Sequence, residues 1–271
     1  MLDSRAEIRA GQRFAFGANW RRFIDTVDDT KVQIATDSLV RALGSPDLGG
    51  RTFLDVGCGS GLFSLAANNL GAEVRSFDFD PESVAVTAEL RARFAPGASW
   101  PIEQGSILDE DYVAGLGRYD IVYSWGVLHH TGDLWRAMEL AAGLVNPGGL
   151  LFVSIYNDQG PSSRLWARVK RRYNTSGRVG RAIILLFSAG YIWRWWPVKR
   201  LITGIRGGRP PTARGMSVRH DMVDWVGGYP FEVAKPEKVF DFLRDRGFEL
   251  RHLKTCAGNL GCNEYVFVAP H

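Results

Sequence analysis

Cysteines, metal-binding spacings and long apolar runs are all scarce in this 271-residue chain. It has only three cysteines, too few for a disulfide framework, and this favours a reducing compartment. No HxH, CxxC or HExxH pattern is present, so we expect no metal site. The N-terminus mixes charges and has no apolar core of signal-peptide length, so we expect a cytoplasmic protein.

Acidic residues are missing from one long segment. Residues 161–220 contain 14 Lys and Arg and no Asp or Glu, whereas the rest of the chain holds 19 basic and 29 acidic residues. The net charge of +4 therefore combines a strongly basic segment with an acidic remainder. We expect the basic segment to have a role of its own.

Two helices are expected in this basic segment. The first, over 163–173, places Leu165, Val169 and Tyr173 along one stripe, with Lys170 and the arginines elsewhere. The second includes 12 uncharged residues, 182–193, well short of the ~20 needed to span a bilayer. Clustered Trp and Arg residues suit a helix that lies in a membrane interface. Residues 161–206 are thus a candidate for peripheral contact with the inner face of the membrane.

A lid or a homodimer surface explains the same composition slightly better. In that case the apolar stretch is buried and the arginines point into solvent. Nucleic-acid binding, through basic charge and stacked aromatics, is the least favoured reading.

The run from Phe53 to Gly61, FLDVGCGSG, is the most informative stretch of the chain. It predicts a buried strand, a glycine-rich turn and a helix that begins near Leu62. Glycines let a ligand approach the backbone, and the amides at a helix start add donors and partial positive charge. A second expected strand ends in Asp78, where an acidic residue of a doubly wound sheet bonds the ribose hydroxyls of a nucleoside.

Four motifs follow one another between about residues 50 and 156: LDVGCGSG, SFDFDPESV, YDIVYSWGVLHH and NPGGLLFVS. In this order they resemble the motifs of class I S-adenosylmethionine-dependent methyltransferases. The closest likeness is to the ubiquinone-biosynthesis-like small-molecule O-methyltransferases. NAD-binding dehydrogenases are the competing family, but they carry GxGxxG/A, whereas here GCGSG is followed by Leu62.

The alternation of strand-like and helix-like stretches, together with this resemblance, predicts an α/β fold with a doubly wound, seven-stranded, mostly parallel sheet. We expect an N-terminal helical extension (1–48), a cofactor-binding core (49–158), a basic helical insertion after the fifth strand (159–232) and a last helix with an antiparallel strand hairpin (233–271). In the extension, the turn-prone stretch 16–20 is expected to precede a single helix through Phe23, Val27 and Ile34.

The resemblance implies S-adenosylmethionine as the cofactor and S-adenosylhomocysteine as the product. Asp78 would bind the ribose diol, and Phe79 would lie against the adenine. Ser106 stands where the family often has an Asp that accepts from the adenine amino group, and its hydroxyl is expected to take over that bond. The expected cofactor-binding residues are Asp55, Gly57, Cys58, Gly59, Asp78, Phe79, Ser106, Ile107 and Ser124. Asp80 is expected to cap the next helix.

Methyl transfer from a sulfonium depends mainly on proximity and orientation, and a general base adds ~10²–10⁴-fold when the acceptor is a hydroxyl. The resemblance places His130 at the family's histidine and His129 at its acidic residue. His220, after the basic segment, is a further candidate base. The alternative for each is a purely structural imidazole. The expected acceptor wall consists of Trp20, Trp125, Tyr156, Asn157 and Tyr229.

The sequence therefore predicts a methyltransferase acting on a small-molecule or lipid-linked acceptor, above all at oxygen with a histidine base. Methylation at carbon or nitrogen of another metabolite or of RNA remains an alternative. A further alternative is a catalytically idle S-adenosylmethionine-binding protein at the membrane or in an assembly. The motifs argue against a nucleic-acid acceptor, because no Asn-Pro-Pro-Tyr sequence follows the fourth expected strand.

Overall fold

A seven-stranded sheet forms the centre of the computed structural model, which describes residues 4–193, 218–258 and 261–271. The strand order is β3-β2-β1-β4-β5-β7-β6, and β7 is antiparallel to both of its neighbours. This confirms the expected α/β class. The strands are β1 (Thr52–Val56), β2 (Glu73–Asp78), β3 (Ile102–Gln104), β4 (Tyr119–Trp125), β5 (Val145–Tyr156), β6 (Glu249–Lys254) and β7 (Cys262–Val268).

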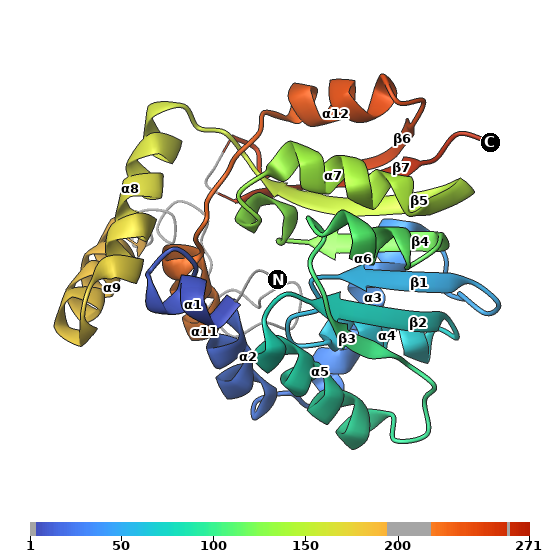
Figure 1. Cartoon of the computed structure of the whole chain (residues 1–271), viewed down its shortest axis with the longest axis horizontal. Coiled ribbons are helices and arrows are strands. Elements are labelled where there is room, and N and C mark those ends of the chain that lie inside the picture. Colours follow the sequence, from blue (N-terminus) through green and yellow to red (C-terminus); the bar gives the residue numbers. More distant parts are fainter. Residues whose placement is uncertain (1–3, 194–217, 259–260) are drawn as a thin grey trace, which may run out of the picture.

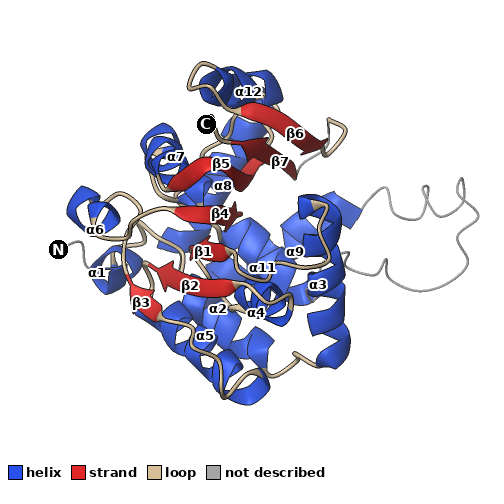
Figure 2. Ribbon diagram, turned by 90° about the vertical axis from the view of Figure 1, so that its right-hand side faces the viewer, coloured by secondary structure: helices blue, strands red, loops and turns tan. Residues whose placement is uncertain are grey.

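Helices cover both faces of the sheet (Figures 1 and 2). Successive residues of a strand point to opposite faces, so Phe53 packs in one core and its neighbour Leu54 in the other. The Phe53 side carries α3 (Asp29–Leu43), α4 (Leu62–Asn69) and α5 (Pro81–Phe94). The Leu54 side carries α6 (Glu110–Ala114), α7 (Leu134–Gly143) and α12 (Pro236–Arg244).

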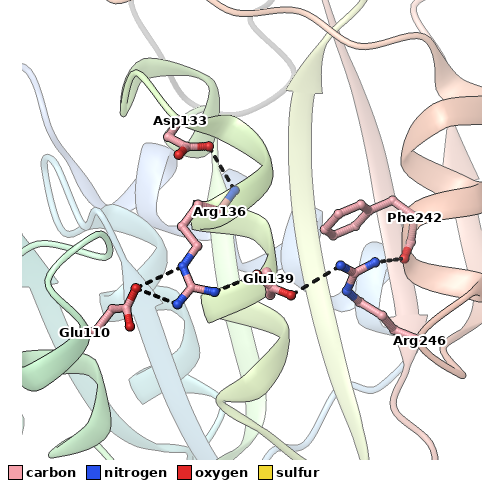
Figure 3. A network of polar contacts seen from close by, with 6 residues as sticks. All are labelled: Glu110, Asp133, Arg136, Glu139, Phe242 and Arg246. Atoms are coloured by element: carbon pink, nitrogen blue, oxygen red, sulfur yellow. Dashed lines mark hydrogen bonds and ion pairs between the residues drawn. The ribbon is translucent and has the colours of Figure 1, made fainter.

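A chain of ion pairs joins α6, α7 and the turn that follows α12 on the Leu54 side (Figure 3). Arg136 bonds Glu110 at 2.5 Å and Glu139 at 2.6 Å, and Glu139 also accepts from Arg246 at 3.3 Å. The Arg246 guanidinium lies 3.6 Å from the centroid of the Phe242 ring. These ion pairs are partly exposed to solvent, so each contributes little to folding stability.

A third group of helices lies beyond the carboxyl ends of the parallel strands (Figure 1). It consists of α1 (Ser4–Arg9), α2 (Phe16–Ile24), α8 (Pro161–Thr175), α9 (Arg178–Trp193) and α11 (Val218–Gly227). Phe14, Tyr173 and Val226 form its buried centre, so the N-terminal segment and the insertion share one small core. This core stands over the edge of the sheet at which ligands bind in such folds.

The N-terminal extension differs from the single expected helix. Residues 16–20 are helical and belong to α2, and the chain then breaks before α3. Asp28 causes the second start, because its side chain accepts from the Lys31 amide and caps α3. The expectation of a turn followed by one continuous helix was therefore wrong.

The buried face of α8 also differs from the expected stripe. Its buried residues include Trp166, Lys170 and Tyr173, whereas Leu165 is 54% exposed. Lys170 was expected to lie off the apolar stripe and is instead fully buried. Aromatic residues from β5 and α11 enclose it, so the apolar periodicity of α8 did not identify the buried face.

Candidate functional site

The glycine-rich turn follows β1 at the carboxyl edge of the sheet. Gly57 and Gly59 have φ values of +78° and +56°, a region that side chains other than glycine rarely occupy. A Cβ on Gly57 would lie 2.4 Å from Val127, and one on Gly59 would lie 2.9 Å from the indole nitrogen of Trp20. The turn therefore needs glycines for its backbone and for its close neighbours, and Trp20 of α2 covers it.

Asp78 ends β2 beside this turn. One carboxylate oxygen accepts from the Gly59 amide at 3.0 Å and the other from the Asp80 amide at 2.9 Å. Each oxygen retains a second lone pair, so the carboxylate can also accept from the two hydroxyls of a ribose. Burial raises the pKa of Asp78 to about 6, against two backbone amides that lower it.

The predicted residues Asp55, Cys58 and Ser124 support the turn from the sheet and the neighbouring helices. Asp55 accepts from the Ser64 hydroxyl of α4 at 2.5 Å, and Ser124 donates to the Val56 carbonyl at 3.1 Å. Cys58 is buried, which raises the pKa of its thiol. These contacts fix where β1 ends and where the turn begins.

The adenine side of the expected site contains a residue that the sequence did not single out. The Arg13 guanidinium lies 4.7 Å from the centroid of the Phe79 ring, and Arg13 also donates to the His130 carbonyl at 2.9 Å. Ser106 accepts from the Leu108 amide at 3.2 Å, so its hydroxyl already has one partner. Ile107, next to it, is buried in the core on the α7 side.

His129 and His130 lie together in a short 3-10 turn, η1 (Leu128–His130), with ring centroids 4.4 Å apart. His129 Nδ1 accepts from the Tyr156 amide at 3.4 Å, whereas Nε2 has no hydrogen-bond partner among the described residues. His130 Nδ1 lies 2.5 Å from the Pro230 carbonyl. A carbonyl only accepts, so Nδ1 carries the proton and Nε2 presents a lone pair.

Burial controls the protonation of both rings. It lowers the pKa of His129 well below the usual value and the pKa of His130 to about 3. The Pro230 carbonyl opposes this shift at His130. Both imidazoles are therefore neutral at physiological pH.

The residues of the expected acceptor wall are divided between several places. The Tyr156 ring lies 4.2 Å from the His129 ring, and Tyr229 precedes Pro230, the partner of His130. Asn157 accepts from the Asn263 amide at 3.1 Å, and Trp125 packs against the core on the α3 side. The structure thus gathers the two histidines, Tyr156 and the 229–230 loop. His220 falls in α11, but its side chain lies outside the described residues.

Lys170 is a second residue that sequence reasoning missed. It is fully buried beside Tyr156, and burial lowers its pKa to about 7, while Asp224 favours the charged form. No local signal separates it from the exposed arginines on either side of it in α8. Within the described ranges, no cluster of His, Cys, Asp or Glu could hold a metal ion.

Comparison with known proteins matches residues 29–202 to a family model described as a methyltransferase domain. The chain is 33% identical over 115 residues to a ubiquinone biosynthesis O-methyltransferase of Methylobacterium sp. (strain 4-46), covering 42% of this chain and 45% of that protein. It is 27% identical over 150 residues to the protein of the same name from Rhizobium etli (strain CIAT 652), covering 55% and 51%. The chain thus spans about half the length of these curated relatives.

Solved structures show the same fold over nearly the whole chain. Magnesium protoporphyrin IX methyltransferase from Synechocystis PCC 6803, with bound S-adenosylmethionine, has a TM-score of 0.56 at 16% identity and covers 99% of this chain and 98% of its own. An S-adenosylmethionine-dependent methyltransferase from Mesorhizobium loti has a TM-score of 0.51 at 16% identity, over 85% and 96%. The glycine turn and the Asp78 carboxylate fit the same cofactor. The chain belongs to the methyltransferase domain family, and its fold is that of the S-adenosylmethionine-dependent methyltransferases.

Proposed function

We propose that this chain transfers a methyl group from S-adenosylmethionine to an oxygen atom of a small-molecule or lipid-linked acceptor. The observation that carries the proposal is the His130 imidazole, which is neutral, held through Nδ1 and provided with a lone pair at Nε2. The O-methyltransferase names of the relatives support oxygen as the acceptor atom.

The residues of the chain divide the work between cofactor and acceptor. The cofactor supplies an electrophilic methyl group on a sulfonium. Asp78 and the glycine turn bind and orient it, and Trp20 covers the turn against water. His130 Nε2 takes the proton that the acceptor hydroxyl loses. His129 is bound to the β5 backbone and has a supporting role.

The acceptor side of the proposal includes contact with an anionic membrane surface. Five apolar side chains are 46–75% exposed at helical spacing along α9: Val179, Ile183, Leu186, Phe187 and Tyr191. The helices α8 and α9 also carry exposed arginines, and each contributes about 1 kcal/mol near anionic lipid. No helix among the described residues is long and apolar enough to cross a membrane. Such a surface would bring the site to a lipid-linked acceptor.

The reaction is tested by incubating the protein with methyl-labelled S-adenosylmethionine and a panel of phenols and catechols, with and without isoprenoid tails. The products are analysed by mass spectrometry. We expect an O-methylated product from the wild type. His130→Ala should keep S-adenosylmethionine binding and lose turnover, whereas Asp78→Ala should lose both. A product methylated at carbon or nitrogen, or full turnover by His130→Ala, would contradict the proposal.

Flotation with phosphatidylglycerol or phosphatidylcholine vesicles tests the membrane contact. We expect the wild type to float with the anionic vesicles only, and Leu186→Glu/Phe187→Glu to remain in solution. Leu253→Glu, on the 43% exposed Leu253 of β6, is the matched control and should float. If the wild type did not float with anionic vesicles, the membrane contact would be rejected, and a lid or a homodimer surface would be the remaining explanation of the insertion.

A further inference from the structure

Lys170 stands in a cage of aromatic rings within the third group of helices. Its ammonium lies 5.4 Å from the ring centroid of Tyr156, 4.8 Å from that of Trp225 and 4.6 Å from that of Phe231. It donates a hydrogen bond to the Trp225 carbonyl. Lysines are almost never fully buried unless they are paired, so this arrangement indicates a specific task.

The hydrogen bond ties α8 to the C-terminal end of α11. Trp225 and Gly227 belong to the last turn of α11, whose carbonyls lack helical partners. Lys170 donates to the Trp225 carbonyl, and Asn174, one turn further along α8, donates to the Gly227 carbonyl at 2.7 Å. A cation at a helix C-terminus is also favoured by the helix dipole. One face of α8 therefore caps α11.

The end of α11 leads directly to His130. Gly228 follows α11 and lies so close to the imidazole that a Cβ on it would be 2.7 Å from Cε1 and 3.0 Å from Nε2. The carbonyl of Pro230, two residues later, accepts a hydrogen bond from His130 Nδ1–H. Tyr156, one wall of the cage, also packs on both histidine rings. The segment that sets the His130 tautomer is thus anchored at Lys170.

We propose that Lys170 is a positioning residue of the methyl-transfer site, which fixes the end of α11 and the 228–231 loop and thereby holds His130 with Nε2 as a lone pair. The inference rests on the proposed role of His130 as base. It gives the basic insertion a function in the chemistry that is independent of any membrane contact. Other charged or titratable groups that face Lys170 are Asp224 of α11, Cys262 of β7 and the two imidazoles.

Histidine side-chain ¹H–¹⁵N NMR on the full chain tests the inference, because it reports tautomer and titration without an acceptor. We expect a single Nδ1–H tautomer for His130 in the wild type. Lys170→Met should give mixed tautomers and a raised His130 pKa, with S-adenosylmethionine affinity within about threefold of wild type. Arg168→Met, on the exposed face of the same helix, removes the same charge and should leave His130 unchanged.

A folded Lys170→Met with the tautomer and titration of Arg168→Met would overturn the inference. Where Lys170→Met does not fold, Asn174→Ala decides, because it removes the second cap and should also mix the tautomers. An unchanged tautomer in that variant would overturn it too. A normal wild-type tautomer without any O-methylation would instead reject the proposed reaction, so the two failures are distinguishable.

Discussion

Trp20 lies against Gly59 so closely that the turn and the N-terminal helix α2 form one unit. A Cβ on Gly59 would be 2.9 Å from the Trp20 indole nitrogen. The start of α2 is bound as well, because the Gly17 amide donates to Asp80 at 2.9 Å. The N-terminal extension therefore covers the glycine-rich turn through Trp20 and is joined to the start of α5 through Gly17.

Gly59→Ala should weaken S-adenosylmethionine binding by more than about tenfold, because the methyl group displaces Trp20 and strains the turn. Gly50→Ala is the matched control. Gly50 has a similar φ of +71°, but nothing lies within 4 Å of its Cβ position. The Gly50→Ala substitution should lower folding stability by about 1–2 kcal/mol and leave S-adenosylmethionine affinity unchanged. Calorimetry measures the S-adenosylmethionine affinity of both variants. Equal affinities would refute the role of Trp20 as a cover of the turn.

Asp80→Ala should destabilise the chain by about 2–4 kcal/mol. It removes the cap of α5, worth about 1 kcal/mol, and leaves the buried Gly17 amide without an acceptor, worth about 1–3 kcal/mol. Asp109→Ala removes only the cap of α6 and should cost about 1 kcal/mol. Urea unfolding of both variants measures the difference. If Asp80→Ala lowered folding stability no more than Asp109→Ala, the hydrogen bond from the Gly17 amide to Asp80 would not contribute to folding stability.

The sequence predicted the parts of this site whose signal is local. The FLDVGCGSG run predicted β1, its turn and the start of α4, and the Asp-Pro-Glu start of α5 was confirmed with Asp80 as its cap. These features depend on backbone conformation and hydrogen bonds within a few residues. The residues that determine these features are therefore neighbours in the sequence, where a local pattern can identify them.

Arg13 and Lys170 could not be found in this way, because their environments come from distant segments. The partners of Lys170 are at positions 156, 225 and 231, and Arg13 meets Phe79 and the carbonyl of His130. In the sequence, Lys170 is one cation among several in a basic helix. Its burial follows from the packing of α8 on α11, which no local pattern encodes.

S-adenosylmethionine affinity should fall as the pH drops below about 6, the pKa to which burial raises Asp78. The ribose hydroxyls donate to the carboxylate, and protonation removes both its charge and an acceptor. Each pH unit below about 6 should therefore cost about tenfold in affinity. Calorimetry at pH 7.5, 6 and 5 measures this, with Asp78→Asn expected to be weak and independent of pH. A flat wild-type profile would show that the carboxylate does not bind the ribose.

Folding stability should fall on acidification below about pH 6.5, because His130 is buried in its neutral form. Its pKa is about 3 in the folded chain, so only the unfolded chain takes up the proton between about pH 6.5 and 3. Asp78, whose pKa is raised by burial, has the opposite sign and partly offsets this loss between about pH 6 and 4.

Urea unfolding between pH 7.5 and 5 isolates the contribution of His130. His130→Gln should reduce the pH slope by about 1.4 kcal/mol per unit, the value for one proton. His271→Gln, at the exposed C-terminal residue, is the control and should keep the wild-type slope. If His130→Gln kept that slope as well, His130 would take up its proton over the same pH range in the folded and unfolded chains, and burial beside the Pro230 carbonyl would not lower its pKa.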